Sequence, residues 1–175
     1  MGCYNLVQIE ARKPDGEWKQ CDTFPEGAYL ADELPFNYQD YEMYALVANV
    51  RNFYHEIIPL DNIRGLPLDV SEEIKELYYG VENEKPEGFV GFGWEPRSEP
   101  LIDRGRWGTP THFTIQELLD YPHYDRELVS TPDRPVEPGT TLRMELKPHF
   151  FTTLEAFKNW SEYTPDNVRV IMSFD

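Results

Sequence analysis

The sequence predicts a single α+β domain over residues 1–175, in which an N-terminal β-hairpin and a small, mostly antiparallel sheet pack against three to four helices. Three observations support this fold. Alternating apolar residues mark strands near both ends, apolar residues at helical spacing lie between them, and no internal repeat or low-complexity linker divides the chain. The chain is 40% hydrophobic and 14% aromatic, which suits a buried core and argues against a disordered acidic segment.

The first element is the hairpin. Residues 3–12 alternate, and the Pro14-Asp15-Gly16 turn precedes a return strand over residues 17–24. One face of the first strand carries Cys3, Asn5, Val7, Ile9 and Ala11. Residues 25–37 then form a loop.

Two helices are expected next. Asn37 can cap a helix over residues 38–53 whose apolar stripe should be central to the core. That stripe consists of Met43, Leu46, Val47, Val50 and Phe53. Asp69 and Glu72 form a capping pattern ahead of a short helix that ends near Gly80.

The second half predicts two helices and two strands around an irregular connection. Thr114 and Glu117 form a capping box for a helix through about Tyr121, and the proline-rich residues 122–139 predict a long irregular segment. Alternation predicts strands over residues 141–147 and 168–174. Between them, Thr152 and Glu155 cap a helix that turns Leu154, Phe157 and Trp160 toward the core.

The charge is strongly negative and uneven. The net charge is −16, with 18 acidic and 7 basic residues over residues 1–87 and 14 acidic and 9 basic residues over residues 88–175. Such a surface repels nucleic acid and anionic membranes, and it can attract a basic protein surface. A solvated acidic face that serves solubility alone is the simpler interpretation.

The start of the chain has no basic segment followed by an apolar run, and no stretch approaches about 18 apolar residues. We therefore expect a cytoplasmic protein with no membrane contact. Cys3 and Cys21 fall near the ends of the hairpin strands, so they can meet, although a reducing cytoplasm favours two thiols. The aromatic excess is also consistent with a homo-oligomer.

Residues 88–112 predict where a ligand binds, because this segment combines glycines, aromatic residues and arginines within an acidic chain. Arginines match phosphate or carboxylate geometry, and aromatic rings stack on bases. The candidate ligand-binding residues are Trp94, Arg97, Arg104, Arg106, Trp107 and His112, together with Arg64 beside the turn glycine Gly65. A surface ion pair for Arg64 and a capping role for His112 are the alternatives.

No catalytic, metal or cofactor site is predicted. The histidines at 55, 112, 123 and 149 show no metal-ligand spacing, and neither a nucleophile elbow nor a phosphate loop occurs. Carboxylates are too numerous for an acid and base pair to be distinguished.

Several segments, taken in order, resemble a family of uncharacterised proteins encoded by tailed bacteriophages. They are Met1-Gly2-Cys3, residues 41–52 (YEMYALVANVRN), residues 64–71 (RGLPLDVS), residues 114–119 and residues 167–175 (NVRVIMSFD). The family opens Met-Gly-Cys-Asp-Ile-His, whereas this chain has Tyr4, Asn5 and Leu6 at the last three positions. The resemblance implies a phage origin and the cytoplasm of an infected bacterium, and the departure removes any activity that depends on the Asp and His.

Three functions remain open. The first is a phage accessory protein that acts against host defence by capturing a small anionic, nucleotide-like ligand without catalysis. The second is an acidic interaction protein, in effect a nucleic-acid mimic, that occupies a basic surface of a host protein. Its working surface would include Asp15, Glu17, Asp32, Glu33, Asp40 and Glu42. The third is an enzyme acting on a nucleotide or phosphate ester through a non-contiguous site.

Overall fold

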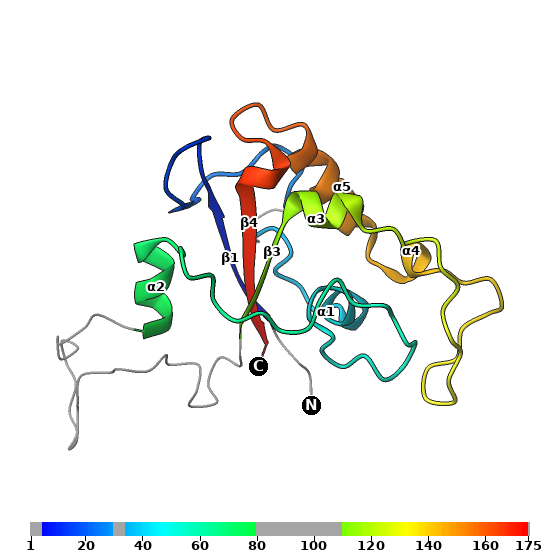
Figure 1. Ribbon diagram of the computed structural model, residues 1–175. Helices are drawn as coiled ribbons and strands as arrows, with labels where there is room; N and C mark the ends of the chain where they lie inside the picture. The colour runs from blue at the N-terminus through cyan, green and yellow to red at the C-terminus, as the bar shows by residue number, and fades with distance from the viewer. Residues whose placement is uncertain (1–4, 30–33, 80–109, 175) are drawn as a thin grey trace, which may run out of the picture.

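The structure is a computed structural model that describes residues 5–29, 34–79 and 110–174. Within these residues, four strands form one antiparallel sheet in the order β2-β1-β4-β3 (Figure 1). The strands are β1 (Asn5–Ala11), β2 (Lys19–Gln20), β3 (Thr111–Thr114) and β4 (Val168–Phe174). The α+β fold predicted from the sequence is confirmed.

Strand β4 is the central element. It pairs with β1 along all seven residues, from Asn5 opposite Phe174 to Ala11 opposite Val168, and with β3 on its other side. All seven residues of β4 are buried, because helices cover both faces of the sheet. The strand expected at residues 168–174 is therefore confirmed as an internal strand.

The N-terminal hairpin is confirmed, but its return strand is shorter than the predicted residues 17–24. Only Lys19 and Gln20 pair with β1. Strand β3 was not expected, since four residues at the end of a glycine-rich segment give too short a pattern to detect.

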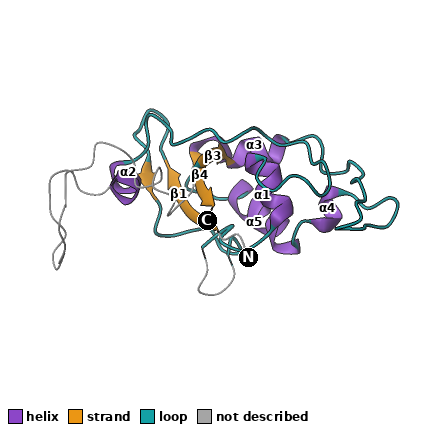
Figure 2. Ribbon diagram, turned by 90° about the horizontal axis from the view of Figure 1, so that it is seen from below, coloured by secondary structure: helices purple, strands orange, loops and turns teal. Residues whose placement is uncertain are grey.

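Helices lie on both faces of the sheet. Figures 1 and 2 show α1 (Tyr41–Ala48), α3 (Ile115–Asp120) and α5 (Pro148–Lys158) grouped on one face, with α2 (Glu72–Tyr79) on the other. The first group encloses the main core around Met43, Phe150 and Val170. Helix α2 packs Ile74 and Tyr78 over Ile171, and the Tyr78 hydroxyl donates to Ser173 Oγ at 3.2 Å.

Helix α1 lies in the core as expected, but it is shorter than residues 38–53. It begins after Asp40, whose carboxylate accepts from the backbone N–H of Met43 at 3.1 Å, so the predicted Asn37 cap is wrong. It ends at Asn49, which adopts the left-handed conformation with φ of 57°. The predicted apolar stripe does not continue, because Val50 is half-buried and Phe53 is 63% exposed.

Of the two capping patterns predicted for α2 and α3, only the one at α3 is confirmed. Helix α2 forms, but Asp69 does not cap it, since its carboxylate binds Arg169 and the Trp18 indole. The predicted box on α3 is confirmed: Glu117 N–H donates to Thr114 Oγ1 at 3.1 Å, and Thr114 N–H donates to Glu117 Oε2 at 2.8 Å.

Residues 141–147 were predicted as a strand, and this prediction is wrong. They contain the short helix α4 (Leu142–Glu145), in which Leu142 and Leu146 are buried four residues apart while Met144 is 69% exposed. Helix α5 begins at Pro148 instead of after Thr152, because proline suits the first helical turn. A 3-10 turn, η2 (Pro165–Asn167), precedes β4.

A buried ion pair lies on the α2 side of the sheet. The Glu10 carboxylate is fully buried and accepts from Arg169 Nε at 2.6 Å and from the backbone N–H of Ser71 at 3.0 Å. Arg169 Nη1 also donates to Asp69 Oδ1 at 2.8 Å. The pair therefore joins β1 and β4 to the chain that leads into α2.

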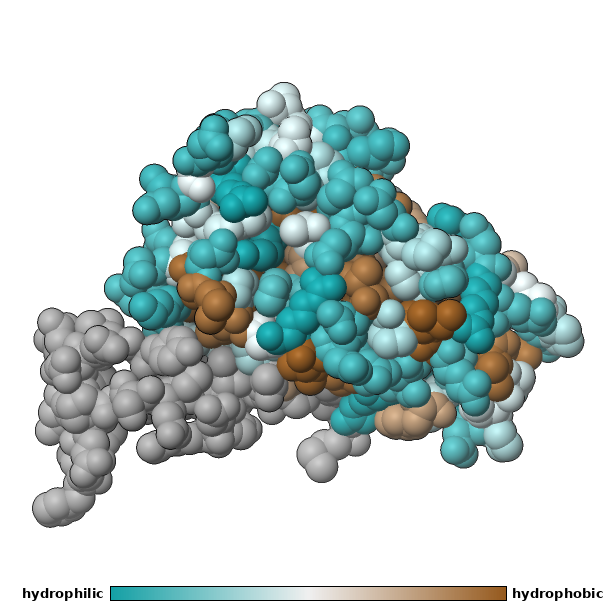
Figure 3. All heavy atoms as spheres, viewed as in Figure 1, coloured by the Kyte–Doolittle hydropathy of each residue, from teal (hydrophilic) through white to brown (hydrophobic). Residues whose placement is uncertain are grey.

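The surface carries apolar residues in separate places. The face drawn in Figure 3 is mostly hydrophilic, with several apolar patches divided by polar residues. The exposed large apolar side chains include Phe53, Leu68 and Met144. Self-association therefore stays a prediction, because these residues do not identify a surface through which two copies would associate.

Candidate functional site

Of the seven predicted ligand-binding residues, the structure describes Arg64 and His112. Trp94, Arg97, Arg104, Arg106 and Trp107 lie outside the described residues. The two that are described come from distant parts of the chain and lie together, since Arg64 Nη1 donates to the backbone oxygen of His112 at 3.1 Å.

The guanidinium of Arg64 already has two anionic partners. Its Nε donates to Asp61 Oδ2 at 3.0 Å, and its Nη1 lies 2.8 Å from Glu117 Oε1. Hydrogen bonding to Arg64 lowers the pKa of Asp61 below its ordinary value. An incoming anion would have to displace a carboxylate from Arg64. The structure therefore agrees with the alternative interpretation, in which Arg64 forms ion pairs at the surface.

His112 and Arg64 together protect the outer edge of β3. His112 Nδ1 lies 2.9 Å from the backbone oxygen of Gly65, and because a carbonyl only accepts, this nitrogen carries the proton. The Gly65 N–H donates in turn to Pro110 O at 2.9 Å. An unpaired edge strand invites association with other chains, and these contacts occupy it. The pair therefore has a structural role.

A second group of charged and aromatic residues is better placed to bind a ligand. These residues come from the start of α1, from the loop after α1 and from the proline-rich connection, and we name them the Tyr41 cluster. Its members are Tyr41, Glu42, Arg51, Tyr54, His55 and Arg134.

Two arginines approach the same aromatic ring. The guanidinium carbon of Arg134 lies 5.4 Å from the centre of the Tyr41 ring and 5.0 Å from that of Tyr54. Arg51 lies 5.3 Å from the Tyr41 ring centre, and it makes no hydrogen bond or ion pair with any other described residue. Cation–π contact stabilises each guanidinium while leaving most of its donors available.

Within this cluster, the Glu42 carboxylate contacts Arg134 and His55. Glu42 Oε1 accepts from Arg134 Nη1 at 2.6 Å and lies 3.7 Å from His55 Nε2. Both Glu42 and His55 are buried, at 8% and 3% exposure. His55 Nδ1 is held by the backbone oxygen of Val129 at 2.9 Å, which directs Nε2 toward Glu42. One guanidinium group and one imidazole therefore contact the Glu42 carboxylate, which also interacts with the carboxyl group of Asp40.

The backbone that carries Arg51 is conformationally strained. Asn49, Arg51 and Glu56 have positive φ angles of 57°, 53° and 51°. Such conformations are uncommon for side chains other than Asn and Gly, each costs roughly 1–3 kcal/mol, and they concentrate at functional sites. The Asn52 side chain holds the loop by bonding both the N–H and the oxygen of Ile57, at 2.9 and 2.6 Å.

The cluster presents an aromatic surface without a deep cavity. The Phe53 ring lies 4.3 Å from that of Tyr54 and is 63% exposed, whereas the hollow among the cluster residues is only about 10 Å³. A ligand would therefore lie on the surface, with a flat ring against Phe53 and Tyr54 and its charge toward the arginines.

Comparison with protein-family models, curated proteins and solved structures finds no match. Within residues 5–29, 34–79 and 110–174, no group of three or more His, Cys, Asp or Glu residues could hold a metal ion. No helix in the same ranges is long and apolar enough to cross a membrane.

Sequence reasoning missed the Tyr41 cluster because its members have no common spacing. Arg134 reaches Glu42 across 92 residues of sequence. The one available signal was Arg51, which follows α1 and could be interpreted equally well as a partner of the helix dipole.

Proposed function

We propose that this protein is a non-catalytic binding protein that holds a small anionic ligand with an aromatic ring, such as a nucleotide. The supporting observation is that Arg51 and Arg134 both approach the Tyr41 ring, while Glu42 pairs with only one donor nitrogen of Arg134 and Arg51 forms no ion pair within the described residues. This pair of guanidinium groups occurs in a chain whose net charge is −16. A phosphate or carboxylate group placed there would pair with them through charge-assisted hydrogen bonds.

Each part of the Tyr41 cluster has a role in this proposal. Arg51 and the donors of Arg134 that Glu42 does not use bind the oxyanion. The exposed ring of Phe53 and the half-buried ring of Tyr54 stack on the base, a contact that tolerates different bases. Glu42 and His55 are buried beneath the surface, where Glu42 pairs with Arg134. They position this arginine without touching the ligand.

Residues 88–112 remain a second proposed contact region. Arg97, Arg104, Arg106, Trp94 and Trp107 have the chemistry for such a ligand. Arg64 and His112 hold each other and the β3 edge, so their contribution to binding would be indirect.

The resemblance to tailed-phage proteins suggests a biological setting for the proposal. In an infected bacterium, a protein that sequesters a nucleotide used as an immune signal would act against host defence. Such a function requires tight binding and no turnover.

The proposal can be tested with a panel of mono-, di- and cyclic nucleotides, using thermal shift to detect binding and mass spectrometry to identify the released ligand. We expect one ligand class to raise the Tm and to be recovered intact. Arg51→Ala or Arg134→Ala should weaken it about tenfold or more, because hydrogen bonds to charged groups contribute roughly 1.5–3 kcal/mol.

The matched control is Arg126→Ala, which removes an exposed arginine outside the cluster. Arg104→Ala, Arg106→Ala and Trp107→Ala test the second region in parallel. Equal affinity for wild type, Arg51→Ala and Arg134→Ala would reject the Tyr41 cluster as the site. Recovery of a converted nucleotide would favour the enzyme alternative.

The acidic-surface alternative needs a different set of residues from the one expected. Asp40 and Glu42 are buried and engaged, Asp40 as the α1 cap and Glu42 with Arg134, so neither can face a partner. Asp15 and Glu17 are exposed, and Asp32 and Glu33 lie outside the described residues.

A further inference from the structure

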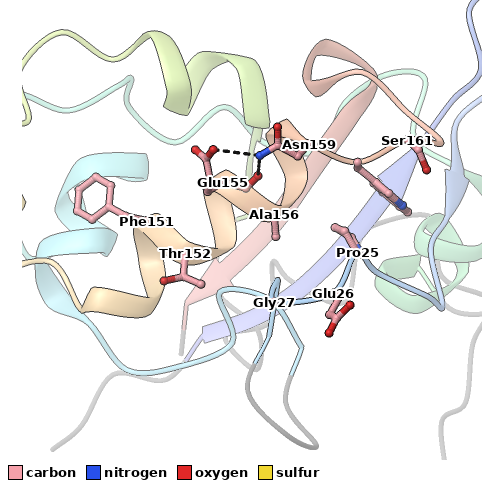
Figure 4. A pocket seen from close by; sticks show the side chains of 10 residues that line it. Pro25, Glu26, Gly27, Phe151, Thr152, Glu155, Ala156, Asn159 and Ser161 are labelled. Atoms are coloured by element: carbon pink, nitrogen blue, oxygen red, sulfur yellow. Dashed lines mark hydrogen bonds between the residues drawn. The ribbon is translucent and has the colours of Figure 1, made fainter.

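An open groove runs along helix α5. None of the described residues that line it belongs to the Tyr41 cluster. Its volume is about 840 Å³, and it lies between the Pro25–Gly27 turn and the outer side of α5 (Figure 4). Ala156 and Gly27 bring the two walls close together, since a Cβ added at Gly27 would stand 4.0 Å from the Ala156 Cβ. Gly27 has a φ of 85°, which a side chain would strain.

The charged residues that line this groove are both glutamates. Glu26 lies on the turn side and Glu155 on the α5 side (Figure 4). Neither Arg nor Lys is among the described lining residues, and Lys158 Nζ lies 4.0 Å from the Glu155 carboxylate. Both glutamates are exposed, and Glu155 Oε1 accepts from Asn159 Nδ2 at 3.0 Å (Figure 4). Because this amide partner is neutral, both carboxylates keep a negative charge that a cation in the groove would meet.

One aromatic ring that lines the groove can serve as a contact for a cation. Trp160 lines the groove and is held edge-on by Phe157 at 5.7 Å and by Tyr163 at 4.9 Å. These contacts fix the ring in place, which lowers the entropic cost of using it as a contact surface. Tryptophan is the aromatic side chain that best binds a guanidinium or ammonium group.

We propose that this groove binds a short, extended, arginine- or lysine-bearing segment of a partner protein. A cationic side chain would lie over Trp160, and neighbouring cations would pair with Glu26 and Glu155. Charge complementarity selects this occupant, because the lining repels nucleic acid and other anions. The proposal is independent of ligand binding at the Tyr41 cluster.

The test uses the full chain and a fluorescently labelled octapeptide, (Gly-Arg)₄, with (Gly-Glu)₄ as the acidic counterpart. Anisotropy should show saturable binding of the arginine peptide alone, weakening as salt is added. Glu26→Gln with Glu155→Gln should weaken binding about fivefold or more, and Trp160→Leu by a similar factor.

The control is Glu137→Gln with Glu145→Gln, which makes the same change in net charge at two exposed glutamates away from the groove. Equal weakening in the two double variants would show that the peptide responds to the overall charge of −16 and would overturn the proposal. Sedimentation is run alongside, and self-association that Trp160→Leu abolishes would assign the groove to a second copy instead. Circular dichroism confirms that each variant is folded. If Trp160→Leu is not folded, Trp160→Phe replaces it as the variant that tests the contribution of the indole ring.

Discussion

The guanidinium of Arg169 lies 4.0 Å from the centre of the Trp18 ring. The same arginine pairs with the fully buried Glu10 of β1, so a buried strand residue carries a carboxylate whose ion-pair partner is Arg169. Arg12 approaches Trp18 as well, at 4.6 Å. The α2 side of the sheet is thus organised by charge and aromatic contact in addition to apolar packing.

Removing Arg169 should destabilise the protein strongly. Arg169→Met leaves the Glu10 carboxylate buried with only the Ser71 N–H as a partner, and losing one member of a buried pair costs about 3–5 kcal/mol. Urea denaturation gives the free energy of unfolding. The double variant Glu10→Met with Arg169→Met should recover part of the loss, because no unpaired charge remains. A loss below 1 kcal/mol in the single variant would show that the pair is not buried as described.

Truncating Leu46 should also be costly. Leu46 is fully buried in α1, so Leu46→Ala should lower the free energy of unfolding by about 2–5 kcal/mol through lost burial and a cavity. Val50→Ala should cost less, since Val50 is half-buried beyond the end of the helix. Leu68→Ala is the control, because this side chain is fully exposed. Similar losses for Leu46 and Leu68 would contradict the assigned core.

Stability should respond to the ionisation of Asp40. Burial raises the pKa of its carboxyl from 3.8 to about 6, although hydrogen bonds from the Met43 and Lys147 N–H groups lower it. The folded state therefore holds this proton more tightly than the unfolded state does. Below about pH 4 both states are protonated, and stability is lost as the pH rises from about 4 to 6.

The variant Asp40→Asn isolates this effect. It keeps an oxygen that can accept from Met43 N–H but carries no charge. The difference in unfolding free energy, variant minus wild type, should rise by up to about 3 kcal/mol between pH 4 and pH 7. Chemical denaturation across this range measures it, and a pH-independent difference would falsify the assignment.

Deleting residues 166–175 should abolish cooperative folding. The deletion removes β4, whose seven buried residues join β1 to β3, so the sheet loses its centre. Circular dichroism and thermal unfolding of the truncated chain provide the measurement. A sharp, cooperative unfolding transition in the truncated chain would contradict this prediction.

Long or locally capped patterns were predictable from the sequence. The β4 strand alternates over seven residues, and the Thr114 box on α3 is satisfied within four residues. Residues 141–147 were misassigned because Leu142, Met144 and Leu146 alternate with polar residues, as in a strand. Only Leu142 and Leu146 are buried, and their spacing of four residues also fits a helical turn. The end of α1 was missed because Asn49 provides a left-handed cap without glycine.

The candidate sites were harder to predict, because their residues meet only after folding. Arg64 and His112 were selected as ligand contacts, and their proximity arises from a strand edge that the sequence did not reveal. Arg134 gave no local signal, since its carboxylate partner lies in α1 and its aromatic neighbours in α1 and the following loop.

The pairing of β1 with β4 has a consequence for folding kinetics. Glu10 and Arg169 are separated by 159 residues, so the two longest strands meet only by closing a very long loop. The entropic cost of closure is incurred before those contacts stabilise the chain, and folding slows as the mean separation of contacting residues grows. Until β4 docks, the inner edges of β1 and β3 present open hydrogen-bonding groups. A chain in which β4 has not yet docked would therefore aggregate more readily than the folded protein, and shielding of these strand edges would raise the yield of folded protein.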